Sequence, residues 1–257
     1  MKQILYLACI LAFALGLSAD SSAAGDKPSK WHNISADSLN NQLTKGDDSI
    51  LVINTLSPIE YRDCSIPNSI NIPLEKIETT DKLPKDKATQ IVFYCCSERC
   101  VISKTTADVA VSKLGYTNVF ILDGGLPAWK IAGYPTTTIE RVQRTNILSL
   151  KPDALKKSMD TKNNWVIVDI CPPIVYKTQR LPNSINIPFA DLENRYVELP
   201  MNKMIIIVDK VGHRSFIAAR FLKMKGVKDV RRLFGGIEEW IEYFGEESLV
   251  TDAQTKN

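Results

Sequence analysis

The 257-residue chain is 44% hydrophobic, 24% charged and 8% aromatic, which is too apolar for a disordered or collagen-like protein. Its length suits one large domain or two small ones. Because 32 Lys and Arg residues stand against 29 Asp and Glu, the formal charge is only +3, too weak for a phosphate-binding surface, and we expect no nucleic-acid partner.

The amino terminus has the pattern of an export signal. Lys2 supplies a positive start, residues 4–17 form an apolar run, and small residues follow up to Ala24. Such a run is short for a membrane-spanning helix but suits a secretory signal peptide. We therefore predict a signal peptide over residues 1–24 and an exported chain, periplasmic or extracellular, with no membrane span in its mature part. An uncleaved anchor is the alternative.

An internal repeat divides the rest of the chain. The sequence Pro-Asn-Ser-Ile-Asn-Ile-Pro at residues 67–73 recurs unchanged at residues 182–188. A later motif also occurs in both halves, as Gly124, Gly125 and Trp129 and then as Gly235, Gly236 and Trp240. Since the repeated unit is too long for a short solenoid repeat, we predict two domains, residues 32–136 and residues 146–246.

Short β-rich runs alternate with helical patterns in each half. In the first half, the predicted elements in chain order are a helix at 36–45, strand 50–54, helix 58–63, strands 69–71 and 91–94, helix 103–114, strand 119–122 and helix 126–132. The unbroken apolar runs 91–94 and 204–208 indicate central strands buried on both faces. The pattern predicts an α/β fold in which each domain is a parallel sheet flanked by helices.

The loop after the first central strand carries three thiols. Cys95 ends the strand, and Cys96, Ser97, Glu98, Arg99 and Cys100 follow before Ser103, where we expect the next helix to begin. Ligands of open parallel sheets bind beyond the carboxyl ends of the strands. The helix N-terminus and Arg99 should favour an anion there and lower the pKa of Cys95. A buried, inert cysteine is the alternative.

The equivalent loop of the second half has no thiol. Asp209 occupies the place of Cys95, and His213, Arg214 and Ser215 follow, with Ser215 expected to cap the next helix. A carboxylate cannot accept sulfur as a persulfide, so this half cannot perform the same covalent step. Two roles stay open for it, a structural support for the first domain or a separate anion-binding site.

Taken in order, these motifs resemble the rhodanese sulfurtransferase family over roughly residues 35–245. The resemblance rests on Glu60, Tyr61 and residues 65–73, a strand ending in Cys95, and Gly124, Gly125 and Trp129, with matching features in the second half. It implies a tandem rhodanese-like protein that moves a sulfane sulfur from thiosulfate or a similar small-molecule donor to a thiol, cyanide or a protein acceptor.

The resemblance also implies residue roles. Cys95 would be the nucleophile that becomes a persulfide, and substrate would be bound by the loop residues Cys96, Ser97, Glu98, Arg99 and Cys100, whose amides would hold the departing anion. No metal or organic cofactor is expected. A zinc site built from Cys64 and the three loop cysteines has unsuitable ligand spacing.

Two further functions remain open at this point. The cysteines of the loop could serve an exported thiol redox protein, in which Cys96, Cys100 or Cys64 resolves an oxidised Cys95. The two loops could instead belong to a rhodanese-like binding module without catalytic activity.

Overall fold

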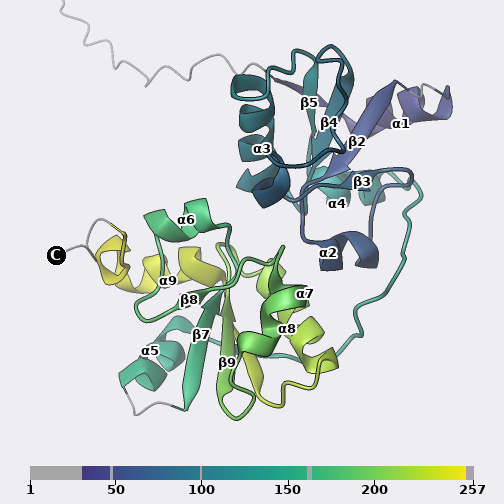
Figure 1. Cartoon of the computed structure of the whole chain (residues 1–257). Coiled ribbons are helices and arrows are strands. Elements are labelled where there is room, and N and C mark those ends of the chain that lie inside the picture. Colours follow the sequence, from purple (N-terminus) through teal and green to yellow (C-terminus); the bar gives the residue numbers. More distant parts are fainter. Residues whose placement is uncertain (1–30, 47–48, 99, 161–163, 253–257) are drawn as a thin grey trace, which may run out of the picture.

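Two α/β domains follow one another along the chain (Figure 1). The computed structural model describes residues 31–46, 49–98, 100–160 and 164–252. The predicted signal peptide, residues 1–24, lies outside the described residues. None of the helices in the described ranges has both the length and the apolar character needed to cross a bilayer.

The first domain is a five-stranded parallel sheet in the order β1-β5-β4-β2-β3. Its strands are β1 (His32–Ile34), β2 (Ile50–Asn54), β3 (Ile70–Asn71), β4 (Gln90–Tyr94) and β5 (Val119–Leu122). Its helices are α1 (Ala36–Thr44), α2 (Pro58–Asp63), the 3-10 helix η1 (Leu74–Lys76), α3 (Val101–Ser112) and α4 (Gly125–Ile131).

The second domain repeats this topology in the order β6-β10-β9-β7-β8. Its strands are β6 (Leu148–Leu150), β7 (Trp165–Asp169), β8 (Ile185–Asn186), β9 (Met204–Val208) and β10 (Val230–Leu233). Its helices are α5 (Pro152–Asp160), α6 (Pro173–Thr178), α7 (Leu192–Arg195), η2 (Tyr196–Glu198), α8 (Arg214–Met224), α9 (Gly236–Phe244) and η3 (Glu246–Ser248).

Both faces of each sheet are covered, as the unbroken apolar runs predict. In β4, Ile91 and Phe93 pack in one core cluster with α3, whereas Val92 and Tyr94 pack in another with α1 and α4. Successive side chains of a strand point to opposite faces, so a strand buried on both sides must be apolar at every position. The predicted α/β fold with two parallel sheets is confirmed.

Several sequence-based boundaries differ from the structure by one or two residues, and three differences are larger or bear on the site. The edge strand β1 was not predicted, because three residues give no clear periodicity. Helix α3 begins at Val101 with Cys100 as its N-cap, so the prediction that Ser103 opens this helix is wrong. Helix α8 begins at Arg214, so Ser215 lies inside its first turn rather than capping it.

The repeated heptapeptide forms the same turn in both domains. Asn68 and Asn183 have positive φ angles of 60° and 61°, a conformation that asparagine tolerates better than most residues. Beyond the turn, the Asn71 side-chain amide donates to the carbonyl oxygens of Asn54 at 3.1 Å and Leu56 at 2.9 Å. The heptapeptide therefore fixes the loop that follows β2, which borders the site described below.

The double glycine is needed because α4 begins directly against the cysteine loop. Gly125 has a φ of +59°, and a Cβ atom there would lie 2.5 Å from the carbonyl oxygen of Cys95. The same carbonyl accepts a hydrogen bond from the Leu126 amide at 2.9 Å. This close approach holds the backbone of Cys95 in place, and Gly236 packs against the Asp209 carbonyl in the same way.

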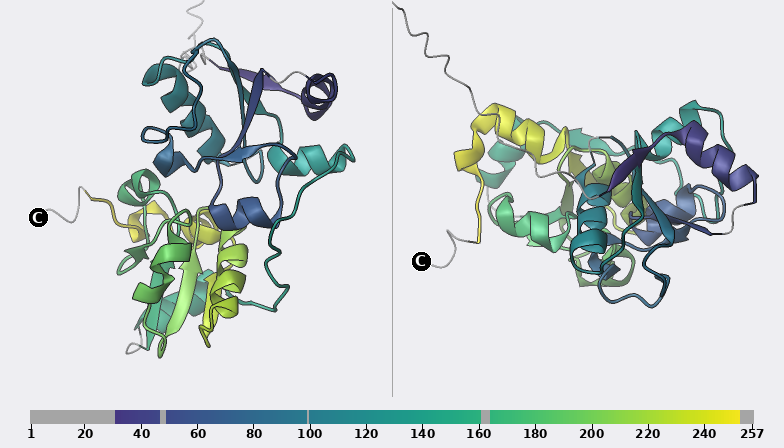
Figure 2. Two further views of the ribbon diagram at one scale, coloured as in Figure 1. Left: turned by 45° about the vertical axis from the view of Figure 1, so that its right-hand side comes forward. Right: turned by 90° about the horizontal axis from the view of Figure 1, so that it is seen from above.

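Helix α2 of the first domain packs against the second domain (Figure 2). Its Ile59 side chain is 2% exposed and belongs to a core cluster otherwise made of residues from the linker and the second domain. Arg62 of the same helix pairs with Glu193 of α7 at 2.6 Å. The two domains therefore share part of one apolar core.

Replacing Gly125 tests the close approach to Cys95. We expect Gly125→Ala to lower the free energy of unfolding by about 2–4 kcal/mol, because both the positive φ and the clash with backbone oppose a Cβ atom. Gly133→Ala is the matched control, since its φ is +79° and nothing lies within 4 Å of a Cβ atom; a loss of about 1 kcal/mol is expected there. Equal losses in urea unfolding would contradict the proposed role of the contact.

Candidate functional site

Cys95 lies at the carboxyl end of β4 and faces the first turn of α3. Its Sγ is 3.2 Å from the Ser103 hydroxyl, 3.3 Å from the Ser97 carbonyl oxygen and 3.8 Å from the Cys100 carbonyl oxygen. The thiol therefore sits where the sequence places it, at a strand end and a helix start. Two carbonyl oxygens, those of Ser97 and Cys100, lie beside the sulfur together with the Ser103 hydroxyl.

The environment of Cys95 favours the neutral thiol. The residue is 2% exposed. A hydrogen bond with the Cys100 thiol, followed by burial, raises the pKa of Cys95 well above the ordinary thiol value, while Ser103 and the Ser97 backbone act in the opposite direction. The prediction that this pKa is lowered is therefore wrong, because burial and a second thiol outweigh the hydroxyl and backbone donors.

The other loop residues differ in exposure. Cys100 is 9% exposed and lies in one buried cluster with Cys95, against which Cys96 packs. Its pKa is raised to about 12: the Cys95 thiol lowers it, but the Cys96 thiol and burial raise it further. Cys96 and Ser97 are partly exposed and Glu98 is fully on the surface, whereas Arg99 lies outside the described residues.

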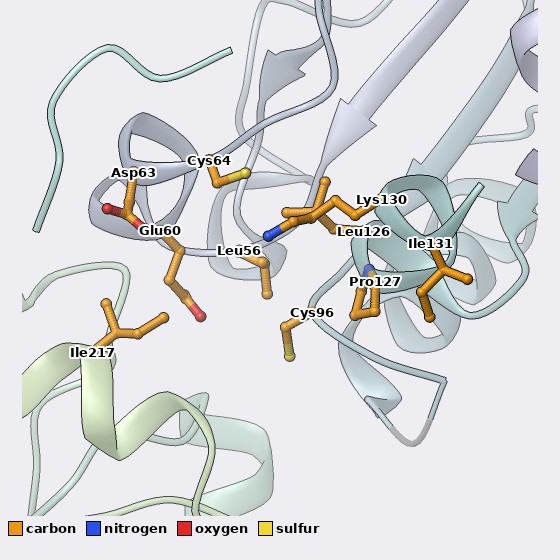
Figure 3. Close-up of a pocket in the computed structure, with 10 residues that line it drawn as sticks. All are labelled: Leu56, Glu60, Asp63, Cys64, Cys96, Leu126, Pro127, Lys130, Ile131 and Ile217. Carbon is orange, nitrogen blue, oxygen red and sulfur yellow. The ribbon is translucent and has the colours of Figure 1, made fainter. Parts of the chain in front are cut away.

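A cavity of about 410 Å³ opens beside Cys96 (Figure 3). Its walls are largely apolar and come from Leu56, Leu126, Pro127, Ile131 and, from the second domain, Ile217. Its polar lining consists of Glu60, Asp63, Cys64, Cys96 and Lys130. Cys96 is thus the loop thiol that borders this cavity, and Cys64 lies on another wall of it.

The second domain places an arginine beside the cysteine loop. The Arg214 guanidinium pairs with the Glu60 carboxylate, with Nε 3.0 Å from Oε1 and one Nη 2.8 Å from Oε2. The two side chains are only 11% and 3% exposed. Arg214 also interacts electrostatically with Cys96 and Cys100. Arg214 is therefore a positive charge near the thiols that the sequence analysis did not predict.

Sequence reasoning did not predict this pair. Glu60 also caps its own helix, since its Oε2 accepts from the Ser57 amide at 3.0 Å and the Ser57 hydroxyl at 2.7 Å. The capping box was visible as Ser57 followed three residues later by Glu60. Nothing in the sequence indicated that the carboxylate also meets Arg214, because 154 residues separate the two.

The loop of the second domain closes onto that of the first. Asp209 accepts a hydrogen bond from the Arg214 amide at 3.1 Å and is 3% exposed. A narrow cavity of about 50 Å³ lies between the two loops and is lined by Cys96 and Cys100 from one side and by Cys171, Asp209 and Arg214 from the other. Cys171 is 4% exposed, and its pKa is raised by burial and by the neighbouring carboxylates.

In the ranges that the structure describes, no group of three or more His, Cys, Asp or Glu side chains is arranged to hold a metal ion. The chemistry that the site can perform with its own groups is that of its thiols.

Comparison with known proteins agrees with this geometry. Residues 35–132 and 151–243 each match the rhodanese-like domain. The chain belongs to the rhodanese-like family. The putative sulfur carrier protein YrkF of Bacillus subtilis is 30% identical over 96 residues, which are 37% of this chain and 52% of that protein. The thiosulfate sulfurtransferase GlpE of Pseudomonas syringae is 26% identical over 84 residues, 33% of this chain and 79% of that protein.

Among solved structures, the thiosulfate sulfurtransferase of Pseudomonas aeruginosa aligns with a TM-score of 0.40 and 20% identity, covering 79% of this chain and 43% of that one. The chain spans about half or less of the length of the first curated rhodanese-like relatives, with shares between 22% and 52%.

Removing one member of the buried ion pair should destabilise the folded protein. We expect Arg214→Met to lower the free energy of unfolding by about 3 kcal/mol, because the Glu60 carboxylate is left buried without its counter-charge. Adding Glu60→Gln should recover part of the loss, since glutamine keeps the helix cap without a charge. The free energy of unfolding of each variant is measured in urea. If the double variant lost as much free energy as the two single variants together, the pairing would be refuted.

The thiols should differ in their reaction with iodoacetamide. At pH 7.5 we expect Cys96 to be labelled fastest in the folded protein, and Cys95, Cys100 and Cys171 to be labelled much more slowly, because they are buried and mostly neutral thiols. Since Cys100 has a pKa of about 12, its labelling rate should climb about tenfold per pH unit between 8 and 10 without a plateau. Peptide mapping that found Cys95 labelled as fast as Cys96 would contradict this order.

Proposed function

We propose that this rhodanese-like protein is a sulfurtransferase that takes a sulfane sulfur from thiosulfate or a similar donor and carries it as a persulfide on Cys95. The observation that supports this most directly is the position of Cys95 Sγ at a strand end, 3.2 Å from the Ser103 hydroxyl in the first turn of α3. A hydroxyl donor and the positive end of a helix stabilise the anionic sulfur that such chemistry forms.

The proposed step is a displacement at sulfur. The thiolate of Cys95 attacks the outer sulfur of thiosulfate, a sulfur–sulfur bond forms, and the bond to the sulfonyl sulfur breaks to release sulfite. The persulfide then passes its outer sulfur to a thiol, to cyanide or to a protein acceptor. The names of the relatives, a sulfur carrier and a thiosulfate sulfurtransferase, support this reaction class.

The proposal also covers where the protein acts. The signal-like pattern of residues 1–24 supports export to a periplasmic or extracellular location, where the same reaction would serve extracytoplasmic sulfur compounds.

A second candidate function rests on the contact between two thiols. Because Cys95 and Cys100 lie in one buried cluster, oxidation could join them and the loop could cycle between dithiol and disulfide. Under that function the protein would oxidise or reduce dithiol substrates and would form no stable adduct with thiosulfate.

The test is the mass of the intact protein after treatment with thiosulfate. We expect a gain of about 32 Da, one sulfur atom, and turnover of thiosulfate plus cyanide to thiocyanate. Cys95→Ser should abolish both signals, whereas Cys171→Ser, a matched change at a buried cysteine of the second domain, should keep them. Thiocyanate formation that survives Cys95→Ser would refute the role of Cys95, and dithiol oxidation without any adduct would favour the redox function.

A further inference from the structure

The exposure of the three loop cysteines increases from Cys95 through Cys100 to Cys96. Cys95 is 2% exposed and Cys100 9% exposed, while Cys96 is partly exposed and borders the large cavity. Cys95 and Cys100 lie in one buried cluster and Cys96 packs against it, so the three cysteines lead from the interior to the cavity. Cys95 itself does not line the cavity. An acceptor in this cavity therefore meets Cys96 and not Cys95.

The cavity has the size and lining of a site for an organic molecule. At about 410 Å³ it falls in the range of roughly 300–1,000 Å³ that is typical of small-molecule sites, and it is far larger than thiosulfate or cyanide needs. Leu56, Leu126, Pro127 and Ile217 give it apolar walls. Such walls favour an apolar body over a small, strongly hydrated anion.

The charges around the cavity indicate one polar feature of its ligand. The Glu60 carboxylate is neutralised by Arg214, and Asp63 accepts the Val142 amide at 2.8 Å and points away from the cavity in Figure 3. Lys130 makes no salt bridge with any described residue, and its ammonium group extends toward the cavity in the same view. A carboxylate on the ligand would complement it.

We propose that the cavity binds the sulfur acceptor, an organic thiol with an apolar body and a carboxylate, and that Cys96 delivers the sulfur to it after a relay from Cys95 through Cys100. This inference rests on the proposed function and adds to it the class of acceptor and the delivering residue. It also assigns a role to the second domain, whose Ile217 forms one wall of the acceptor site.

Each relay step is a thiol exchange that needs no oxidant. The Cys100 sulfur attacks the outer sulfur of the Cys95 persulfide, that sulfur–sulfur bond breaks, and the Cys100 proton passes to the Cys95 sulfur. Cys96 then takes the sulfur from Cys100 in the same way. Finally the acceptor thiol attacks the Cys96 persulfide and leaves as an organic persulfide, which restores the Cys96 thiol.

The first experiment follows the discharge of the persulfide. Protein loaded with thiosulfate is treated with 4-mercaptophenylacetate, a thiol of the proposed class, alkylated and digested with trypsin. Cleavage after Lys87 and Arg99 separates the peptide with Cys95 and Cys96 from the peptide that begins at Cys100. In Cys96→Ser the first peptide contains Cys95 as its single thiol, so its persulfide is assigned without ambiguity.

We expect the persulfide that Cys96→Ser carries on Cys95 to be lost to the aromatic thiol at least about tenfold more slowly than that of the wild type, with each rate taken relative to the sulfur that the variant has loaded. Discharge at the wild-type rate would overturn the relay, as would the same slowing in Cys64→Ser with none in Cys96→Ser. Release of hydrogen sulfide with a disulfide between Cys95 and Cys100 would also overturn it, because Cys100 would then attack the inner sulfur. Failure of the wild type to load any sulfur would instead refute the proposed function.

The second experiment tests the acceptor class. Ile217→Glu places a carboxylate in the apolar wall contributed by the second domain, and we expect it to raise the KM for 4-mercaptophenylacetate about tenfold, with each rate taken relative to the sulfur that the variant has loaded. Ile139→Glu is the matched control at a side chain that is 63% exposed and does not line the cavity. Equal KM values for both variants, or a wild-type preference for 2-mercaptoethanol over the aromatic thiol, would overturn the assignment of the cavity.

Discussion

A buried bidentate ion pair determines how the two domains meet. Arg214 and Glu60 are both largely withdrawn from water, and burying two charges costs several kcal/mol per ion unless their hydrogen bonds are well satisfied. Glu60 meets that requirement because its carboxylate also accepts from the backbone and hydroxyl of Ser57. Since Arg214 begins α8 and Glu60 lies in α2, the pair brings the loop of the second domain against the thiols of the first.

The two domains use one scaffold for different purposes. In both, the carbonyl at the end of the central strand is held by a glycine with positive φ, Gly125 against Cys95 and Gly236 against Asp209. In both, a polar side chain at the end of the neighbouring strand accepts the amide two residues later, Asn54 at the end of β2 and Asp169 at the end of β7. The two loops share this frame but differ at its end, where Cys95 stands in the first domain and Asp209, which accepts the Arg214 amide, stands in the second.

Packing, more than the order of residues, sets the behaviour of the thiols. Cys95 and Cys96 are neighbours in sequence, yet one is sealed against the first turn of α3 and the other borders a cavity. Successive residues leaving a strand point in different directions, so adjacent cysteines meet different surroundings. The raised pKa of Cys95 and the pairing of Arg214 with Glu60 show that burial, rather than the neighbouring cation, dominates the surroundings of this thiol.

The sequence by itself determined the duplication, the α/β class and the position of Cys95 at a strand end, because an exact heptapeptide, unbroken apolar runs and paired glycines are local signals. Helix 58–63 and strands 50–54 and 119–122 have the predicted bounds. Only the tertiary structure decided the protonation of Cys95, the cavity beside Cys96 and the meeting of Arg214 with Glu60. Each of these depends on burial or on contact between residues far apart in the chain. Neither can be predicted from the spacing of residues within a short segment.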